Sequence, residues 1–459
     1  MYNIDFNNPV HAHFIGIGGI SMSGFAMLLH SMGFHITGSD REKSEITENL
    51  ETLGIDIKYE QIADNINDDI DVVIYTAAIH PDNPEYAECI RRGIPMLERA
   101  ELVGQVMTNY STAIAVAGTH GKTTTTSMIS ELLIAAGSDP TISVGGILPS
   151  IGGNIRIGSS KNFITEACEY TNSFLKFHPT IGIILNIEED HMDFFKDIND
   201  IRASFRKFAA LIPDNGTLII SSDIPDHEEI TEGLSCNILT FGMEHAADYT
   251  PGDISYDDMG CAEFDVFLGE KKRGRFHINV PGVHNVSNAL ASVALSDTLG
   301  ISDDALRQAF DEFRGANRRF EYKGKLNGFT IIDDYAHHPT EIRATLKAAA
   351  KVSHRDLWVA FQPHTYSRTK AFLHDFADAL SAADHIMLTD IYAAREPDPG
   401  DISSVDIAKL LEAAGKDVTY FNSFDSLKKF ILKNLVNDDL LITMGAGNIV
   451  NIGDELLGK

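Results

Sequence analysis

The sequence predicts an α/β protein of three successive domains, each built around a largely parallel sheet. Three blocks of the chain each restart a pattern in which a short apolar strand leads through a loop into a helix. Strands that alternate with helices in this way are typical of parallel sheets, because a parallel pair needs a crossover connection. The chain has 459 residues, and at roughly 150 residues per domain this length also favours three domains.

The first block begins with a predicted strand, His13–Ile17, followed by a glycine-rich turn. A helical pattern runs from Ser21 to Met32 and is ended by Gly33. A second strand is expected at Phe34–Gly38 and a further buried strand at Asp71–Thr76. This order predicts a nucleotide-binding α/β domain over residues 1–108.

The second block opens with the strand Ala113–Ala117, a glycine-containing loop and an amphipathic helix. Further buried strands are expected at Phe163–Thr165 and Ile181–Asn186. The stretch Cys236–Val280 is rich in turns and polar residues, which favours antiparallel or irregular structure, and Asn285–Leu299 is again helical. These elements predict a central domain over residues 109–314.

The third block alternates strands and helices to the end of the chain, which predicts a doubly wound α/β domain over residues 315–459. Pro339 suits the first turn of a helix, where its missing N–H costs nothing. The expected strands are Thr330–Asp333, Leu357–Phe361, His385–Leu388, Val418–Phe421 and Leu440–Met444.

Composition excludes several classes of function. The formal net charge is −29, which argues against a general nucleic-acid or anionic-membrane surface, because both need a basic face. No apolar stretch approaches the roughly 18 residues of a membrane span, and the first ten residues lack the pattern of a secretory signal. Four cysteines make no disulfide framework, so we expect a cytoplasmic protein.

The first candidate site is the turn after the first strand, which contains Gly16, Gly18 and Gly19. Its backbone N–H groups and the following helix N-terminus could face a diphosphate. Asp40 ends the next strand, about where a ribose-binding acid is found in dinucleotide folds. Ser21 replaces the last glycine of the usual pattern, so an ordinary tight turn is the alternative.

The second candidate site is sharper and is a shortened phosphate loop of seven residues. Glycines let the backbone wrap phosphate oxygens, Lys122 places a charge at the β and γ phosphates, and the Thr123 hydroxyl can reach Mg²⁺. A strand precedes the loop and an amphipathic helix follows it, which is the expected context. The loop residues are Gly118, Thr119, His120, Gly121, Lys122, Thr123 and Thr124.

Acidic side chains and one histidine follow neighbouring strands of the second block. Glu166 lies at the end of one strand, and His191 comes a few residues after another. The carboxyl ends of parallel strands share the edge where open α/β sheets bind ligands. Oxygen ligands suit Mg²⁺, whereas a histidine alone favours a structural interpretation.

Further candidates lie late in the second block and near the start of the third. Asn285 and Asn288 could contact an adenine edge or cap a helix. Arg319 could clamp a phosphate or be solvated. Asp334 and His337 fall where a strand enters a helix, in a run with Asp333 and His338 that suggests a site.

Taken together, these residues resemble the Mur ligase family over nearly the whole chain. The phosphate loop is typical of the family as a whole. The runs Asp-Asp-Tyr-Ala-His-His-Pro-Thr-Glu and Phe-Gln-Pro-His-Thr-Tyr-Ser-Arg-Thr are similar to its alanine-adding members. The matching segments are His13–Gly24, Gly38–Asp40, Gly118–Thr125, Asn186–Asp193, Gly282–Leu290, Arg318–Glu321, Asp333–Glu341, Phe361–Thr369 and Asp390–Pro397.

The resemblance implies a Rossmann-like UDP-binding domain, a central phosphate-loop ATP-binding domain and a C-terminal domain that helps bind ATP and the amino acid. It implies ATP-dependent ligation of L-alanine to UDP-N-acetylmuramate through an acyl phosphate, in peptidoglycan synthesis, with Mg²⁺. The implied UDP-substrate-binding residues are Gly16, Gly18, Gly19, Ser21 and Asp40, with the three glycines at the diphosphate. The implied metal ligands are Thr123, Glu166 and His191. The implied adenine-side residues are Asn285 and Asn288, and the implied ribose-facing acid is Asp334. The implied catalytic residues are Lys122, Arg319 and His337, with His338 as the alternative to His337.

Three alternatives stay open on the sequence. One is a ligase of the same family that recycles a whole peptide. Another is a nicotinamide-dependent dehydrogenase, although Ser21 and the phosphate loop count against it. The last is a non-catalytic nucleotide-binding regulator, which would have no reason to carry Glu166, His191 and Asp334 together. The chain also departs from common family members in carrying Cys168 for Asp and Ala336 for Gly.

Overall fold

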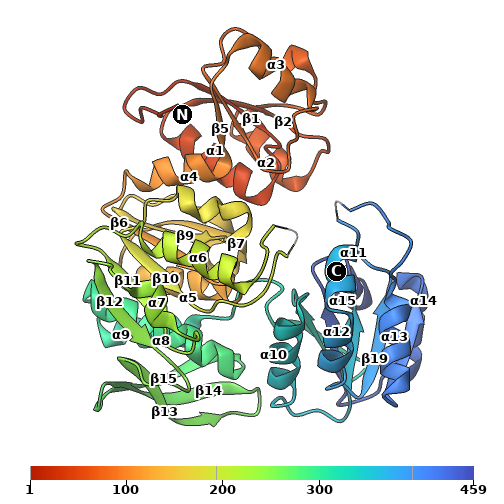
Figure 1. The fold of residues 1–459 in the computed structure, drawn as a ribbon. Helices are drawn as coiled ribbons and strands as arrows, with labels where there is room; N and C mark the ends of the chain where they lie inside the picture. The colour runs from red at the N-terminus through yellow and green to blue at the C-terminus, as the bar shows by residue number, and fades with distance from the viewer. Residues whose placement is uncertain (1, 193, 395) are drawn as a thin grey trace. The chain divides into compact units, whose positions relative to one another are not determined.

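The computed structural model describes residues 2–192, 194–394 and 396–459, and it has the mixed α/β architecture expected (Figure 1). Asp193 and Arg395, which fall in two of the matching segments, lie outside the described residues. The chain groups into two compact units. The first comprises residues up to 240 together with 297–300, and the second comprises 241–296 and 301–459. The boundaries predicted at residues 108 and 314 stay predictions.

The first sheet of the first unit is entirely parallel, in the order β3-β2-β1-β4-β5. Its strands are β1 (His11–Ile15), β2 (His35–Ser39), β3 (Asp56–Lys58), β4 (Val72–Tyr75) and β5 (Met96–Glu98), and its helices are α1 (Ile20–Ser31), α2 (Glu45–Thr52), η1 (Ala63–Asn65), α3 (Pro84–Arg92) and α4 (Arg99–Met107).

Alternate residues of β1 face opposite sides of this sheet. Phe14 belongs to the same buried apolar cluster as Phe25 of α1. Its neighbour Ile15 belongs to a separate cluster with Cys89 of α3. The two helices therefore cover opposite faces, as Figure 1 shows, and the sheet is buried on both sides as a parallel sheet requires.

The first strand begins and ends two residues earlier than predicted. Gly16 takes a φ of 80°, which turns the chain out of the strand. The N–H groups of Gly16 and Ile17 both donate to the carbonyl oxygen of Ser39, at 2.8 and 3.0 Å. Since only glycine takes that conformation readily, the glycine-rich turn starts at Gly16, and Ile17 belongs to the turn.

The second sheet of the first unit carries the phosphate loop. Within this unit its order is β12-β11-β10-β6-β9-β7-β8. β6 lies between β9 and β10 and pairs with both in parallel, so the loops after these three strands meet at one edge. The elements are β6 (Thr112–Ala117), α5 (Lys122–Ala135), β7 (Thr141–Leu148), η2 (Pro149–Ile151), β8 (Gly153–Arg156), β9 (Asn162–Ala167), η3 (Tyr170–Lys176), β10 (Ile181–Ile184), α6 (Ile198–Ala209), β11 (Thr217–Ser221), α7 (His227–Thr231) and β12 (Asn237–Phe241).

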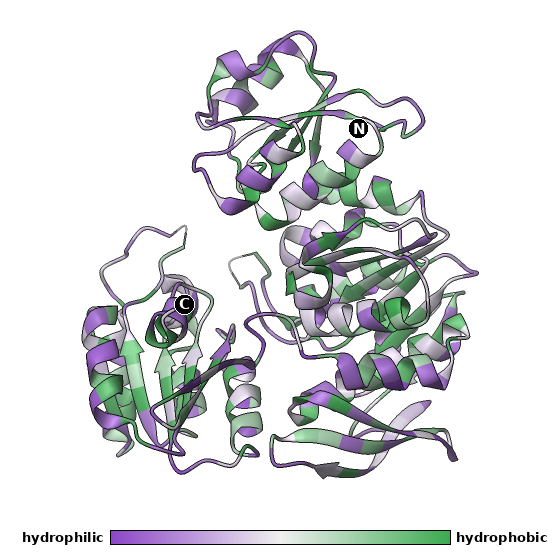
Figure 2. Cartoon of the chain, turned by 180° about the vertical axis from the view of Figure 1, so that it is seen from behind, coloured by the Kyte–Doolittle hydropathy of each residue, from purple (hydrophilic) through white to green (hydrophobic). Residues whose placement is uncertain are grey.

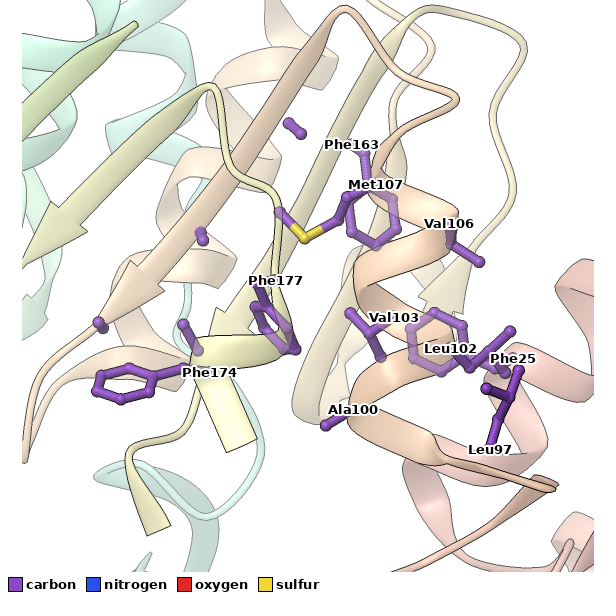
Figure 3. Packing of buried hydrophobic residues seen from close by; sticks show 14 of the residues in the cluster. Phe25, Leu97, Ala100, Leu102, Val103, Val106, Met107, Phe163, Phe174 and Phe177 are labelled. Carbon is purple, nitrogen blue, oxygen red and sulfur yellow. The ribbon is translucent and has the colours of Figure 1, made fainter. Parts of the chain in front are cut away.

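Helix α4 is packed on two sides within the first unit (Figure 3). One buried apolar cluster contains this helix together with residues from both sheets. These are Phe25 and Leu97 from around the first sheet, and Phe163 and Phe177 from around the second. Gly104 allows the close approach, because a Cβ there would lie 1.9 Å from the carbonyl oxygen of Lys176. The helix is therefore held in a fixed position.

The second unit begins with three antiparallel strands, as expected for that stretch, and continues into a six-stranded sheet in the order β16-β17-β21-β18-β19-β20. Its elements are β13 (Tyr249–Tyr256), β14 (Cys261–Leu268), β15 (Lys271–Pro281), α8 (Val283–Leu299), α9 (Asp303–Glu312), β16 (Glu321–Leu326), β17 (Phe329–Asp334), α10 (Pro339–Ala349), β18 (Leu357–Phe361), α11 (Tyr366–Ala371), α12 (Leu373–Leu380), β19 (His385–Thr389), α13 (Ser404–Ala413), β20 (Asp417–Phe421), α14 (Phe424–Asn434), β21 (Leu440–Met444) and α15 (Val450–Leu457).

Five strands of the six-stranded sheet lie where they were predicted, within one residue at each end. The sequence analysis missed β16, which pairs with β17 in antiparallel orientation. Figure 2 shows apolar strands between helices whose outer surfaces are polar. Val359 faces one apolar cluster and Trp358 the other, so this sheet too is covered on both faces, which confirms a doubly wound arrangement.

We predict that Gly104→Ala destabilises the protein by about 1–3 kcal/mol, because the added methyl group would overlap the carbonyl oxygen of Lys176. Alanine inside a helix is otherwise more favourable than glycine by about 1 kcal/mol. A loss of stability would therefore show that the steric overlap outweighs the gain in helix propensity. Urea denaturation measures it. Gly153→Ala is the control, since nothing lies within 4 Å of a Cβ there. An unchanged or higher stability for Gly104→Ala would contradict the close packing.

Candidate active site

The phosphate loop joins β6 to α5 through two glycines in conformations that other residues avoid. Gly118 has a φ of 145° and Gly121 a φ of 84°. A Cβ on Gly118 would lie 3.0 Å from the Cβ of Leu185. The loop therefore needs glycine at both positions, and it delivers Lys122 as the first residue of α5.

Lys122 is folded back onto its own loop. Its Nζ donates to the carbonyl oxygens of Gly118 and Thr119, at 2.5 and 3.0 Å, and to Oε2 of Glu169 at 3.0 Å. Burial by itself would lower the pKa of Lys122, but the charge of Glu169 raises it above its ordinary value. The lysine is therefore held as a cation at the place where a phosphate group would need one.

Glu169 is a residue of this site that the sequence analysis missed. Its side chain is only 3% exposed, it pairs with Lys122, and its Oε1 lies 3.8 Å from Nε2 of His191. It lies two residues after the end of β9, at the same sheet edge as the loop. Its position near the end of a predicted strand could have identified it, but only the neighbouring Glu166 was predicted as a site residue at that strand.

Asn186 holds the outer part of the loop in place. Its Oδ1 accepts from the His120 backbone N–H at 2.8 Å, and its Nδ2 donates to the His120 carbonyl oxygen at 3.0 Å. The Glu188 N–H donates to the Thr119 hydroxyl at 2.9 Å. The segment after β10 therefore braces the loop, which gives Asn186 a structural reason to belong to the matching segment.

Thr123 and Glu166 bring two oxygen ligands together. The Thr123 hydroxyl donates to Oε2 of Glu166 at 3.0 Å, and the Gly145 N–H donates to Oε1 at 2.5 Å. Glu166 lies inside β9 rather than beyond its end. A hydroxyl beside a carboxylate is the hard donor set that Mg²⁺ takes together with substrate phosphates and water, so these two residues fit such an ion.

His191 lies at the same edge, in a left-handed backbone conformation with a φ of 55°. Its ring packs on that of Tyr170 with centroids 4.6 Å apart. Among the described residues, no group of three or more His, Cys, Asp or Glu side chains forms a cluster for a metal ion. A metal at this edge would thus take part of its coordination from phosphate and water.

The glycine-rich turn uses Asp40 as part of its own structure. Oδ2 of Asp40 accepts from the Gly18 N–H at 2.8 Å. The carbonyl oxygen of Ile20, in the first turn of α1, accepts from Nδ2 of Asn154 at 2.8 Å, and Ser21 contacts Arg99. The turn and the start of α1 are therefore held by three side chains, those of Asp40 after β2, Arg99 of α4 and Asn154 of β8.

In the second unit, Asp334 ends β17 and is buried. Its Oδ2 accepts from the Phe320 N–H and its Oδ1 from the Ala336 N–H, both at 2.8 Å. Burial raises the pKa of Asp334 to about 6, although the nearby charge of Arg319 and the two N–H donors act in the opposite direction. This carboxyl group is an acceptor held by the backbone.

Arg318 and Arg319 separate into two environments. Arg318 pairs with the buried Asp333 at 3.1 Å and so braces β17. Both guanidinium groups lie over the Tyr335 ring, that of Arg318 at 4.9 Å and that of Arg319 at 5.2 Å from its centroid, and Nη1 of Arg319 is 3.8 Å from Oε1 of Glu341. The charge of Arg319 lowers the pKa of Asp334, so Arg319 belongs to the cluster around that carboxyl group.

The structure also separates the two neighbouring histidines. His338 is buried against Phe372 and caps α10, accepting through Nδ1 from the Thr340 N–H. His337 lies beside His364, with ring centroids 5.4 Å apart, and Nδ1 of His364 is 3.2 Å from Arg368. His337 thus belongs to a polar cluster and His338 to the packing of α10, and the catalytic role of His337 stays a prediction.

Asn285 and Asn288 occupy the first turns of α8, and both are buried. Nδ2 of Asn288 donates to Oδ1 of Asn285 at 3.0 Å, and Nδ2 of Asn285 donates to the Pro281 carbonyl oxygen at 2.8 Å. The two amides brace each other at the helix start, so the choice between an adenine contact and a cap remains a prediction.

Comparison with known proteins gives matches along most of the chain. Residues 11–111 match the family described as Mur ligase family, catalytic domain, residues 116–296 match the Mur ligase middle domain, and residues 318–447 match the Mur ligase, glutamate ligase domain. Three family segments in this order agree with the three domains predicted.

Relatives of full length are similar throughout. A UDP-N-acetylmuramate–L-alanine ligase of Agathobacter rectalis is 60% identical, and one of Lachnospira eligens is 54% identical; each match covers 100% of both chains. The crystal structure of the UDP-N-acetylmuramate-alanine ligase MurC of Thermotoga maritima has a TM-score of 0.82 at 31% identity, covering 98% of both chains. A murein peptide ligase of Psychrobacter arcticus shares the fold, with a TM-score of 0.72 at 24% identity and 98% coverage of both chains.

The raised pKa of Asp334 predicts how stability depends on pH. The folded state holds the proton up to about pH 6, whereas an unfolded aspartic acid loses it near pH 4. Asp334 therefore lowers the free energy of unfolding as pH rises from about 4 to 6, by up to about 3 kcal/mol. Asp334→Asn should remove this loss. The free energy of unfolding of the variant should therefore rise relative to that of wild type as the pH increases across that range. A pH-independent difference in urea denaturation would show that Asp334 titrates normally.

Proposed function

Because the chain belongs to the Mur ligase family, we propose that it joins L-alanine to UDP-N-acetylmuramate. The reaction uses ATP and gives UDP-N-acetylmuramoyl-L-alanine, ADP and phosphate, a step of peptidoglycan synthesis. The observation that carries the proposal is the phosphate loop, where a partly buried Lys122 is held cationic beside Glu169 and the Thr123–Glu166 pair. The full-length relatives support the choice of substrates.

The chemistry explains why such a loop is needed. A carboxylate is a poor electrophile for an amine, so the carboxyl group must first be activated. Transfer of the ATP γ-phosphoryl group to the substrate carboxylate gives an acyl phosphate, and attack by the alanine amine then displaces phosphate. Charge develops on the moving phosphoryl oxygens, and a fixed cation at that place lowers the barrier. Lys122 supplies such a cation.

The remaining residues divide by ligand. We assign the UDP diphosphate to the turn of Gly16, Gly18, Gly19 and Ser21, with Asp40 shaping that turn. We assign the ATP phosphates to the loop residues Gly118, Thr119, His120, Gly121, Lys122, Thr123 and Thr124. Asn285 and Asn288 are assigned to adenine, Asp334 to ribose, and Arg319 to the γ-phosphate.

Thr123, Glu166 and His191 are proposed to hold Mg²⁺. The hydroxyl and carboxylate oxygens of the first two already face each other at 3.0 Å, which suits the ion. When bound, Mg²⁺ would neutralise charge on the β and γ phosphates. His191 lies at the same sheet edge, on the segment that also braces the loop.

The amino-acid site is assigned to the cluster around His337. This histidine, His364 and Arg368 come from the two segments that resemble the alanine-adding members, and the structure brings them together. A guanidinium group suits the carboxylate of a free amino acid. We place His337 as a residue that positions the reactants.

We propose a cytoplasmic location, because the reaction consumes ATP and the four cysteines are free thiols. The described part of the chain has no helix that is both long enough and apolar enough to cross a membrane.

The experiment that tests this function is an assay with purified protein, ATP, Mg²⁺ and UDP-N-acetylmuramate, in which phosphate release is measured with two amino donors in parallel. Free L-alanine should support turnover, and the tripeptide L-alanyl-γ-D-glutamyl-meso-diaminopimelate should not. Turnover with the tripeptide alone would assign the chain to peptide recycling instead. Mass spectrometry of the UDP-linked product identifies the donor that was added.

We predict that Lys122→Ala lowers turnover on the order of 10²-fold or more, as expected for removing one preorganised charge, while the protein stays folded. Lys161→Ala, an exposed lysine of the same unit, is the control and should keep full turnover. Phosphate release with L-alanine measures both, and circular dichroism checks the fold. Near-normal ATP-dependent turnover of a folded Lys122→Ala protein would disprove the assignment.

We expect His191→Ala to raise the Mg²⁺ concentration needed for half-maximal activity and to lower turnover, with ATP binding affected less. The physical reason is the loss of one ligand at the edge shared with Glu166. A Mg²⁺ titration of activity provides the measurement, and the exposed His178→Ala serves as the matched control. If the His191→Ala titration curve coincides with that of wild type, His191 has a structural function only.

A further inference from the structure

Arg99 is a half-buried cation placed directly at the glycine-rich turn. It is the first residue of α4, and its Nη1 donates to the Ser21 hydroxyl at 3.1 Å. Within the part of the chain that the structure describes, no Asp or Glu lies within ion-pair distance of its guanidinium. A chain with a net charge of −29 offers many carboxylates, so an arginine that contacts a hydroxyl instead needs an explanation.

The nearby carboxylates are engaged elsewhere. Glu101 accepts from the Glu98 N–H at 3.1 Å in the cap of α4, and its Oε1 pairs with Lys176 at 3.5 Å. Asp40 accepts from the Gly18 N–H on the turn itself. The guanidinium group of Arg99 therefore has N–H donors to which none of these carboxylates is bound.

The turn needs a cation if it is to bind a diphosphate. Residues 16–21 contain no lysine or arginine, and the carboxylate of Asp40 adds a negative charge at Gly18. Backbone N–H groups and the start of α1 provide only partial positive charge. A diphosphate on this turn would be repelled by Asp40 unless a full positive charge stood beside it.

The position of Arg99 is fixed from outside the turn. Helix α4 packs on Phe25 and Leu97 on one side and on Phe163 and Phe177 on the other (Figure 3). A guanidinium group on such a helix is preorganised, and its planar fork suits two oxygens of one phosphate group.

We propose that Arg99 binds the diphosphate of the UDP-linked sugar substrate and so completes the glycine-rich turn as an anion site. This proposal rests on the function proposed above for the identity of the substrate. It adds a binding residue that lies outside the strand–turn–helix unit, and it assigns Arg99 to the diphosphate rather than to the sugar's carboxylate, because its contact is with Ser21 at the start of α1.

The test is isothermal titration calorimetry with three ligands that differ in one group each: UDP, UDP-N-acetylglucosamine and UDP-N-acetylmuramate. Only the last carries the lactyl carboxylate, while all three carry the diphosphate. Arg99→Ala should raise the Kd for each of them by a similar factor, on the order of 10- to 100-fold, as for a lost hydrogen-bonded charge. Arg99→Lys keeps the charge without the fork and should fall between wild type and Arg99→Ala.

Arg91→Ala is the matched control, since Arg91 is an exposed arginine of the same domain that pairs with Glu88, and its Kd values should equal those of wild type. Thermal unfolding checks that each variant is folded, and Arg99→Lys stands in if Arg99→Ala is not. A loss confined to UDP-N-acetylmuramate would overturn the diphosphate assignment in favour of the carboxylate, and unchanged Kd values for all three ligands would overturn it altogether. UDP binding needs neither alanine nor turnover, so the two proposals can fail separately. If the wild-type protein does not ligate alanine but Arg99→Ala lowers its affinity for UDP, the proposed function is wrong and the assignment of Arg99 to the diphosphate stands.

Discussion

An ammonium group that is largely shielded from water needs a carboxylate beside it, and Glu169 supplies one to Lys122 of the phosphate loop. Without Glu169, burial would favour the neutral amine, and the loop would lose the charge that phosphoryl transfer requires. The parallel pairing of β9 with β6 brings Glu169 to the sheet edge where the loop lies. The Thr123–Glu166 pair lies at the same edge, and so does His191, which follows β10.

The protein binds anions although it is strongly acidic overall. We propose that it does so with single cations that the fold holds in place. Lys122 and Arg319 each face a glutamate, Glu169 and Glu341, at 3.0 and 3.8 Å. A phosphate group bound at either place would have to compete with a carboxylate of the protein. Arg99 differs because its contact is a neutral hydroxyl.

The sequence predicted the parts of this site that depend on local patterns. The glycines of both turns, Lys122 and five strands of the last sheet were found because they follow from spacing and residue type along the chain. Glu169 and Asn186 were missed because their roles arise from pairing between strands, which brings the ends of β6, β9 and β10 together. For the same reason β16 was missed, and only packing distinguishes His337 from His338.

The central claim is that the ATP γ-phosphoryl group activates the substrate carboxylate at this loop. The most direct test uses UDP-N-acetylmuramate with oxygen-18 in its lactyl carboxylate, and follows the label by mass spectrometry of the released phosphate during ligation of L-alanine. We expect ADP and a phosphate that carries one labelled oxygen, since the acyl phosphate breaks at the bond to carbon. Phosphate without label, or AMP in place of ADP, would contradict it.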